Sequence, residues 1–388
     1  MISDQLANFN DRIYFFCLPR TDVEGGDQFQ HLFICLAEGL RELGISFFSN
    51  INYWQESPNT QEYLFRHSPD ITPNDCSIVV FSHNWFNSNH ALPKNLFHKQ
   101  RKYLTVYLDG NDNDQDYNQY PEYKQFDFIF RTHYNRHLKY PKNFYPWNFG
   151  LSNRILQELI ELPNFQDRKK QILINFRHWK TGHPVRNISS SLLMPKISKL
   201  LEINNSVDNK ANYSQEPYHF LHWQQTGARH YPSYYQRLKN SAACACFGGF
   251  FVPSWPNNSG SLVNRNLQRV LTKLRLKSNT VIQWDSWRLW ESLAAGCATF
   301  HVDFDKYGVY LPTMPENWRH YIGIDLDHLP AAVDRIADDP EILERIALEG
   351  RKWAIENYSP VPTALRFLET IYQQKLTHKT EVNSLLNV

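Results

Sequence analysis

The hydrophobic pattern begins with a unit that alternates between strand-like and helix-like spacing. Ile13–Leu18 is a short apolar run of strand length, and Gly25 and Gly26 follow it. Apolar residues then recur at helical spacing over residues 29–43, before Ile45–Phe48 forms the next apolar run. The order strand, glycine turn, helix and strand predicts the opening of a Rossmann-like unit.

Three more apolar runs in the first half end in polar clusters. The runs are Ser77–Ser82, Tyr103–Leu108 and Phe126–Phe130, and the clusters after them are His83-Asn84, Asp109-Gly110-Asn111-Asp112 and Thr132-His133. Ligands of open parallel sheets bind outside the carboxyl ends of the strands. We therefore expect the three clusters to share one rim of a sheet.

The second half of the chain repeats this alternation. Strand-like runs lie at 172–176, 242–247, 298–302 and 321–324, and helical patterns lie at 153–162, 189–201, 330–337, 339–356 and 359–375. This pattern predicts an α/β protein with two Rossmann-like domains that face a cleft. We assign residues 1–165 to an N-terminal domain and 166–358 to a C-terminal domain. Residues 359–388 are expected to form a helix that packs back toward the N-terminal domain, followed by a loose tail.

Composition narrows the class of protein. The formal net charge of +2 comes without a basic block, so no nucleic-acid partner is expected. No apolar run approaches the roughly 20 residues of a membrane span, and the polar start MISDQLANFNDR lacks the apolar core of a secretory signal. Most of the six cysteines lie in apolar runs, which fits a protein of the reducing cytoplasm.

The segment Trp284–Gly296 carries the most chemistry. Asp285 or Ser286 can cap a helix here, and the free N–H groups of the first turn, including that of Trp287, can bind a diphosphate. Arg288 adds a forked cation for phosphate oxygens, and Glu291, one turn later, can accept hydrogen bonds from a ribose diol. The alternative is a capped amphipathic helix with an Arg–Glu pair on its surface.

This segment resembles the nucleotide-binding signature of glycosyltransferases with two Rossmann-like domains, the GT-B fold. Ser286, Arg288, Leu289-Trp290-Glu291 and Ala294-Ala295-Gly296-Cys297 match the signature in order, over about 30 residues. The segment is most similar to the group-1 glycosyltransferases and to the C-terminal part of the exostosin family. The resemblance implies transfer of a sugar from a UDP-, GDP- or dTDP-sugar to a hydroxyl of a glycan, lipid or small molecule. It implies neither a cofactor nor a metal, and membrane contact would be peripheral, through a lipid acceptor.

The resemblance also assigns further residues to the donor. A cationic pair after the first strand of the second half holds the donor diphosphate in similar enzymes, and Arg177 and Lys180 match it here. Gly248 and Gly249 end a strand at the same rim, where a glycine lets the backbone approach a ligand closely. The alternatives are solvated charges on a loop and an ordinary turn.

The donor sugar and the acceptor are expected near three other places. Gly25-Gly26 resembles the N-terminal glycine loop of these enzymes, and Asp285 lies at the start of the signature helix. Many members that retain the anomeric configuration carry a glutamate eight positions before the one that matches Glu291. That position is Gln283, which can hydrogen-bond a sugar hydroxyl but supplies no charge.

A catalytic base is expected on the rim of the first domain. The candidates are His83, Asp109 and His133, of which we select Asp109 and His83. The carboxylates at positions 109, 112, 114 and 116 also permit an oxygen-ligand metal site, but a polar loop is the favoured interpretation.

Two other functions remain open on the same fold. One is a protein that binds nucleotides or carbohydrates without catalysis, because a fold alone does not establish chemistry. The other is a sugar-nucleotide epimerase. The pattern leaves the donor sugar, the acceptor and the stereochemical course undetermined.

Overall fold

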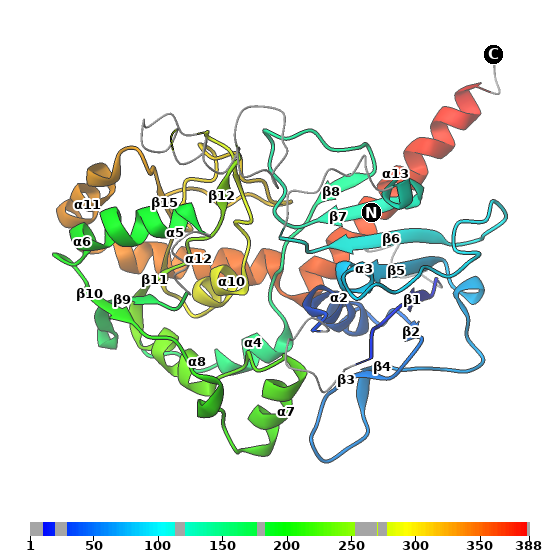
Figure 1. Ribbon diagram of the computed structural model, residues 1–388, viewed down its shortest axis with the longest axis horizontal. Helices are drawn as coiled ribbons and strands as arrows, with labels where there is room; N and C mark the ends of the chain where they lie inside the picture. The colour runs from blue at the N-terminus through cyan, green and yellow to red at the C-terminus, as the bar shows by residue number, and fades with distance from the viewer. Residues whose placement is uncertain are drawn as a thin grey trace.

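The computed structural model describes residues 11–19, 29–112, 121–176, 183–252, 270 and 278–385. Two lobes lie side by side, each built around its own parallel sheet (Figure 1). The N-terminal lobe contains the first sheet, and the C-terminal lobe contains the second.

The sheet of the N-terminal lobe has six strands, all parallel to their neighbours. In spatial order they are β2 (Phe47–Ser49), β1 (Ile13–Phe15), β5 (Ile78–Ser82), β6 (Leu104–Asp109), β7 (Phe128–Arg131) and β8 (Phe144–Pro146). Because β5, β6 and β7 are adjacent, the polar clusters that follow them share one rim, as the sequence predicts.

The sheet of the C-terminal lobe has five parallel strands. In spatial order they are β10 (Glu202–Asn205), β9 (Lys169–Ile174), β11 (Ser241–Ala245), β14 (Ala298–Val302) and β15 (Ile322–Ile324). Two short antiparallel pairs complete the strands, β3 (Tyr53–Gln55) with β4 (Tyr63–Phe65) and β12 (Phe250–Phe251) with β13 (Val281–Ile282).

Helices surround both sheets. Those of the N-terminal lobe are α2 (His31–Glu42) and α3 (His83–Asn87), and α4 (Asn153–Glu158) is the first helix of the C-terminal lobe. Those that follow are α5 (Pro184–Ile188), α6 (Met194–Ile197), α7 (Pro217–Gln225), α8 (Pro232–Lys239), α10 (Trp287–Ala294), α11 (Leu329–Asp338), α12 (Ile342–Tyr358) and α13 (Pro360–Leu385). A π-helical turn over Ser189–Leu193 joins α5 to α6, and short 3-10 turns lie at Pro73–Asp75, Pro121–Gln125, Phe165–Asp167 and Lys210–Asn212.

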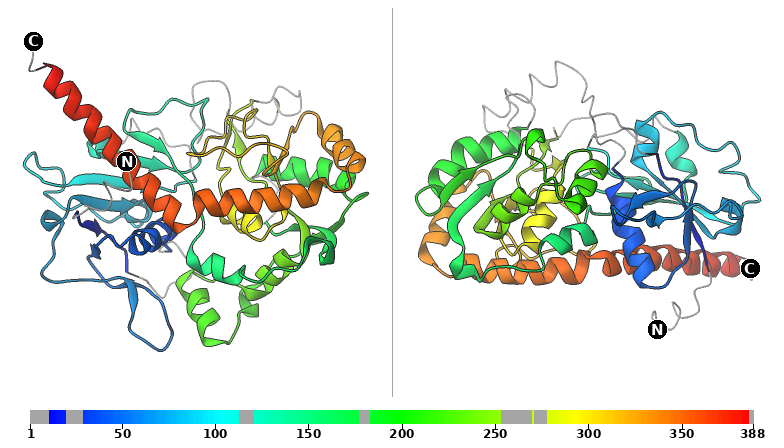
Figure 2. Two further views of the ribbon diagram at one scale, coloured as in Figure 1. Left: turned by 180° about the vertical axis from the view of Figure 1, so that it is seen from behind. Right: turned by 90° about the horizontal axis from the view of Figure 1, so that it is seen from below.

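The last two helices run along the back of both lobes (Figure 2). Helix α13 leaves the C-terminal lobe and completes the core of the N-terminal lobe with Ala364, Phe367, Leu368 and Ile371, all buried. It packs on α2 at Gly39, where a Cβ atom would lie 2.0 Å from the carbonyl oxygen of Pro360. The glycine is therefore required for this close helix contact.

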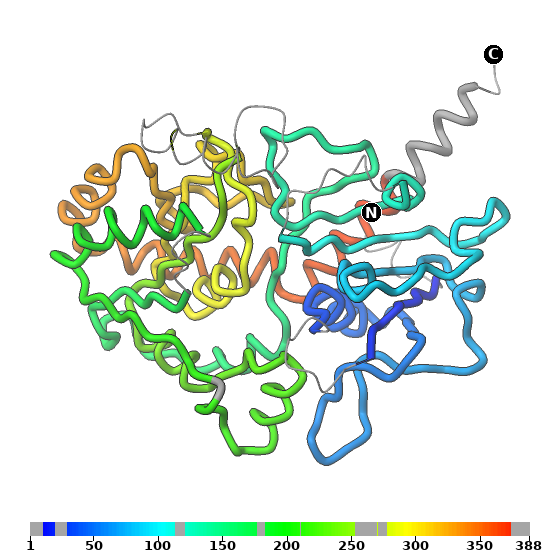
Figure 3. The backbone as a smooth tube through the Cα atoms, viewed as in Figure 1, coloured from blue at the N-terminus to red at the C-terminus, as the bar shows by residue number. Residues whose placement is uncertain are grey.

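The chain crosses between the lobes at two neighbouring points (Figure 3). The first crossing includes Gly150, whose φ of +69° is in the left-handed region. The second lies at the junction of α12 and α13, and the backbone N–H of Leu151 donates to the carbonyl of Tyr358, 2.9 Å away. The two crossings are thus hydrogen-bonded to each other.

The lobes also touch on both sides of these crossings. On one side the Asn135 side chain donates to the carbonyls of Val281 and Tyr307, at 2.9 and 2.8 Å. On the other side, at the lower edge of Figure 1, the β3–β4 hairpin meets α7. There the amide of Gln225 makes two hydrogen bonds to the backbone of Gln55.

Most predicted elements are present, and their ends differ by a few residues. The predicted strand 298–302 coincides with β14, and Gly296 ends α10 with a φ of +64°. The sequence pattern did not predict α7, α8 or the β3–β4 pair. None of the described helices is both long and apolar enough to cross a membrane.

Candidate functional site

Helix α10 begins at the carboxyl rim of the second sheet and faces the N-terminal lobe. Ser286 is its N-cap residue, but the side chain makes no capping hydrogen bond. The amides of Trp287 and Arg288 belong to the first turn, which has no acceptors within the helix. The helix start therefore offers N–H groups and the positive end of a dipole.

Two guanidinium groups converge beside this helix start. Arg288 Nη1 donates to the carbonyl of Asn175, just beyond β9, at 3.1 Å. Arg186 Nε donates to the carbonyl of Phe247, just beyond β11, at 3.0 Å. Backbone carbonyls at the ends of two adjacent strands thus fix both cations.

The positive charges of Arg186 and Arg288 repel each other. Burial and the nearby charge of Arg288 lower the pKa of Arg186 to about 10. Burial and the charges of Arg186 and Arg288 lower the pKa of His183 to about 4. Arg288 Nε is buried and has no hydrogen-bond partner among the described residues. A bound anion would relieve this repulsion and give that N–H group an acceptor.

Glu291 lies one turn deeper in α10, in a buried position. Its Oε1 atom accepts a hydrogen bond of 2.9 Å from the hydroxyl of Tyr235 on α8. Arg154 on α4 in turn donates to the same hydroxyl, also at 2.9 Å. The predicted diol acceptor is therefore held by a side chain that the sequence pattern did not single out.

Gln283 lies in the cleft with a strained backbone. Its φ of +54° is in the left-handed region, which is uncommon for a residue with a side chain. Its side chain hydrogen-bonds Asp112, and its Oε1 atom is buried with no partner in the described part of the chain. Such an acceptor fits a hydroxyl group of a ligand.

Gly248 and Gly249 support this segment. A Cβ on Gly249, whose φ is +104°, would lie 2.4 Å from the carbonyl oxygen of Ile282. A Cβ on Gly248 would lie 3.1 Å from the carbonyl oxygen of Gln283. The two glycines therefore let the backbone before α10 pass closely, and their predicted contact with a ligand stays a prediction.

On the rim of the first sheet, Asp109 is turned into the protein. Its side chain has no exposed area and forms an ion pair of 2.9 Å with Arg131 of β7. Its other oxygen accepts hydrogen bonds from Asn111. Asp109 is thus not placed to receive a proton from a substrate, contrary to the sequence-based selection.

Asp112 is the carboxylate of this rim that reaches the cleft. Its side chain is 62% exposed and lies 3.2 Å from Nε2 of His133. Partial desolvation acts to raise the pKa of Asp112, but hydrogen bonds from His133 and Gln283 outweigh this and lower it to about 2. Asp112 is therefore ionised and oriented at neutral pH.

His133 connects Asp112 to the start of α10. Its Nδ1 atom accepts from the backbone N–H of Asp285 at 3.0 Å, so the ring proton resides on Nε2 and is donated to Asp112. Burial lowers the pKa of His133, which favours this neutral form. His133 is therefore a positioning group between the two lobes.

His83 is a hydrogen-bond donor for the same reason. Its Nδ1 atom accepts from the backbone N–H of Gly110 at 3.2 Å, and burial lowers its pKa to about 4. The neutral ring carries its proton on Nε2 and cannot accept another there. The structure does not support the selection of His83 as a base.

Asp285 and Trp287 hold the lobes together. The carboxylate of Asp285 accepts from the backbone N–H of Phe149 at 2.8 Å and from Trp290 Nε1 at 2.7 Å, and burial raises its pKa to about 7. The Trp287 ring packs against Phe29 of the N-terminal lobe, with a ring separation of 5.1 Å. Both oxygens of the Asp285 carboxylate thus already accept hydrogen bonds within the protein.

The remaining predicted residues, Gly25, Gly26, Arg177 and Lys180, lie outside the described residues. Three residues of the site were not selected from the sequence. Arg186 comes six residues after Lys180, Asp112 three residues after Asp109, and Tyr235 from a helix that was not predicted. Arg186 and Asp112 lie close in sequence to positions that were selected, whereas no sequence pattern around Tyr235 indicated a role in the site.

No protein-family model matches the chain, and no curated protein matches its sequence. Solved structures do resemble it. An α-glucosyltransferase in complex with UDP and a 13-mer DNA with a central A:G mismatch aligns with a TM-score of 0.51 and 11% identity, over 93% of this chain and 99% of that one. An α-glucosyltransferase in complex with UDP-glucose and DNA containing an abasic site gives 0.51 and 9% over the same shares. AviGT4, a glycosyltransferase involved in avilamycin A biosynthesis, gives 0.47 and 12%, over 92% and 96%.

These similarities confirm the predicted fold. Two Rossmann-like domains in the GT-B arrangement account for nearly the whole chain. The relationship to the exostosin family stays a prediction. Because the neighbouring α-glucosyltransferase structures contain DNA, the expected absence of a nucleic-acid partner also stays a prediction.

Proposed function

We propose that this GT-B protein is a glycosyltransferase that moves a sugar from a nucleoside diphosphate donor to a hydroxyl acceptor. The observation that carries the proposal is the pair Arg186 and Arg288, fixed by backbone carbonyls beside the start of α10. Two fixed cations and a helix N-terminus form a site for a dianionic group such as a diphosphate.

The same groups can assist bond cleavage. When the bond between the anomeric carbon and the diphosphate breaks, negative charge grows on the β-phosphate. Cations held in place by Asn175 and Phe247 stabilise that charge without reorganising. Because they supply positive charge themselves, we propose that the reaction needs no metal.

Asp112 is the proposed proton acceptor. As the acceptor oxygen bonds to the anomeric carbon, its proton passes to the ionised carboxylate, and His133 and Gln283 keep that carboxylate oriented. The buried Oε1 of Gln283 is the proposed acceptor for a hydroxyl of the donor sugar.

The donor nucleotide is proposed to be UDP-linked, since UDP and UDP-glucose are the nucleotides in the two structures with the highest quoted similarity. A thermal-shift panel of UDP, GDP and dTDP tests the donor site. We expect UDP to give the largest rise in melting temperature and Glu291→Ala to lose most of it. Absence of a shift with all three nucleotides would contradict the proposal.

Catalysis is tested separately from binding. Incubation with UDP-sugars and no acceptor should release UDP slowly, through transfer to water. A protein that binds UDP tightly but releases none from any donor would be the non-catalytic binder, for which Gln283 in place of a glutamate is the supporting observation. Mass spectrometry and NMR of the recovered donor would reveal an isomerised sugar if the protein were an epimerase.

A further inference from the structure

A buried chain of hydrogen bonds leads away from Glu291. The Tyr235 hydroxyl donates to Glu291 and accepts from Arg154 Nη1, both at 2.9 Å. Arg154 Nη1 also lies 2.9 Å from Nδ1 of His230. His230 Nε2 then lies 3.2 Å from Glu158 Oε1, and His219 approaches the same oxygen at 3.2 Å.

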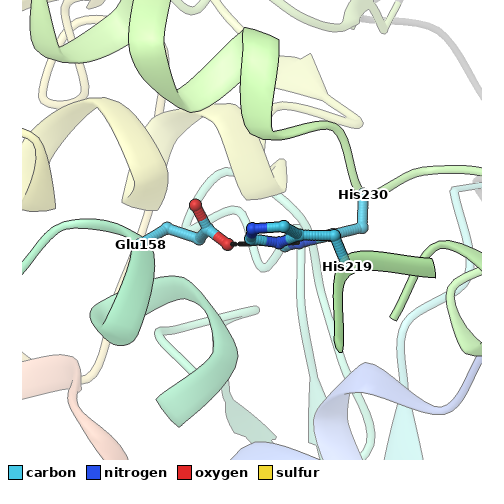
Figure 4. A group of neighbouring side chains, drawn as sticks. All are labelled: Glu158, His219 and His230. Atoms are coloured by element: carbon cyan, nitrogen blue, oxygen red, sulfur yellow. Dashed lines mark hydrogen bonds and ion pairs between the residues drawn. The ribbon is translucent and has the colours of Figure 1, made fainter. Parts of the chain in front are cut away.

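Figure 4 shows the outer end of this chain, where Glu158, His219 and His230 gather. Among the described residues these three side chains have a spacing that suits a metal ion. The protonation state argues against that role. Arg154 can only donate, so Nδ1 of His230 must be the acceptor, and the ring proton therefore resides on Nε2, facing Glu158. A metal would need the lone pair of that same Nε2 atom.

Arg154 also lies where the lobes join. It is the second residue of α4, the first helix after the chain enters the C-terminal lobe. Its guanidinium lies 5.9 Å from the ring of Phe29 in the N-terminal lobe. The backbone N–H of its neighbour Asn153 donates to Glu38 on α2 at 2.7 Å.

We propose that Tyr235 on α8 and Arg154 on α4 are positioning residues for the donor. Together they orient the Glu291 carboxylate toward the ribose diol. The inference rests on the proposed donor site and adds the residues that set its preference for ribose. With Tyr235 bound to Oε1, the rotation of the Glu291 carboxylate is fixed. The carboxylate is thus prepared before the nucleotide arrives.

The test removes one hydroxyl from the protein and two from the ligand. The variant is Tyr235→Phe, and the probes are UDP and 2′,3′-dideoxyuridine 5′-diphosphate, with Kd measured by calorimetry. We expect Tyr235→Phe to weaken UDP about tenfold, since a hydrogen bond to a charged group is lost. Binding of the dideoxy probe should change less than about twofold, because it makes no diol contact.

Tyr234→Phe is the matched control. Tyr234 is the neighbouring buried residue of α8, and its hydroxyl has no hydrogen-bond partner in the described part of the protein. Its loss should leave both Kd values unchanged. Should Tyr235→Phe fail to fold, His230→Gln, two contacts farther out, should weaken UDP about threefold with the same dependence on the diol.

The outcomes separate the two proposals. If the wild-type protein does not bind UDP, the donor site itself fails. If it prefers UDP to the dideoxy probe, but Tyr235→Phe weakens both equally, the positioning role is overturned.

Discussion

The rims of the two sheets face each other across the cleft and differ in charge. The rim of the C-terminal lobe places Arg186 and Arg288 beside a helix N-terminus. The rim of the N-terminal lobe places the neutral rings of His83 and His133 near the exposed, ionised carboxylate of Asp112. In the proposed reaction this difference would separate two tasks, because the cationic rim would bind the diphosphate and the rim with Asp112 would take the proton of the acceptor hydroxyl.

The strongest test of this division is Asp112→Asn. It removes the proposed proton acceptor and keeps the hydrogen-bonding shape, so we expect UDP release from the donor to slow about 1,000-fold. The Kd for UDP should stay the same or fall, because a negative charge near the diphosphate is lost. A variant with full activity would show that the proton leaves by another route.

The opposite rim is tested by Arg288→Gln. We expect the Kd for UDP to rise about 100-fold, because a fixed cation is lost from the diphosphate. The melting temperature without ligand should not fall, because repulsion of Arg186 is relieved. Arg345→Gln, an equal change of charge at an exposed ion pair of α12, is the control and should leave the Kd unchanged.

Asp109→Asn tests whether Asp109 on the rim of the first sheet stabilises the fold or takes part in the reaction. It breaks the buried ion pair with Arg131, and we expect the free energy of unfolding to fall by about 3 kcal/mol, measured with urea. The folded fraction should keep its Kd for UDP. A stable Asp109→Asn protein without activity would return the proton-acceptor role to Asp109.

The smallest expected effect concerns pH. Burial lowers the pKa values of several histidines, to about 3 for His31 and about 4 for His83, His230 and His301. In the unfolded chain these rings bind protons near pH 6.5, so stability should fall as the pH drops below that value. Burial raises the pKa of Glu38 to about 8 and that of Asp285 to about 7, so their contribution falls as the pH rises from about 4 toward 8.

We therefore expect maximal stability at about pH 6.5. Glu38→Gln keeps an oxygen for the N–H of Asn153 and removes the titration, so the decline between about pH 6.5 and 8 should become shallower. Chemical unfolding at a series of pH values measures this. Glu42→Gln, on the same helix and also beside Asn153, is the control, and an equal flattening there would contradict the assignment.

The fold and one half of the site could be predicted from the sequence because their signals are local. The length of a strand, the glycine that ends a helix and the spacing of Arg288 and Glu291 can each be read within one helix or strand. The rim of the first sheet was also predicted, but not the carboxylate that we propose as the proton acceptor. β6 continues one residue farther than its apolar run, so Asp109 still lies in the sheet beside Arg131, and Asp112 is the carboxylate that reaches the cleft.

The residues that could not be predicted depend on tertiary contacts. Helix α8 was not recognised, and the role of Tyr235 appears only when α8, α4 and α10 meet. The sequence assigns Gly248 and Gly249 to a ligand, because a glycine indicates that some group approaches the backbone closely but does not identify that group. The group is the backbone before α10, which comes from a distant part of the chain.

The position of α13 has a consequence for the order in which the protein folds during synthesis. The strands of the N-terminal lobe leave the ribosome first, but their core includes Phe367, Leu368 and Ile371. Until these residues emerge, the face of α2 that they cover stays exposed to solvent, so the first lobe cannot complete its core before the second has been made. A released chain that ends before α13 should therefore have a second lobe with a finished core and a first lobe that proteases still cut.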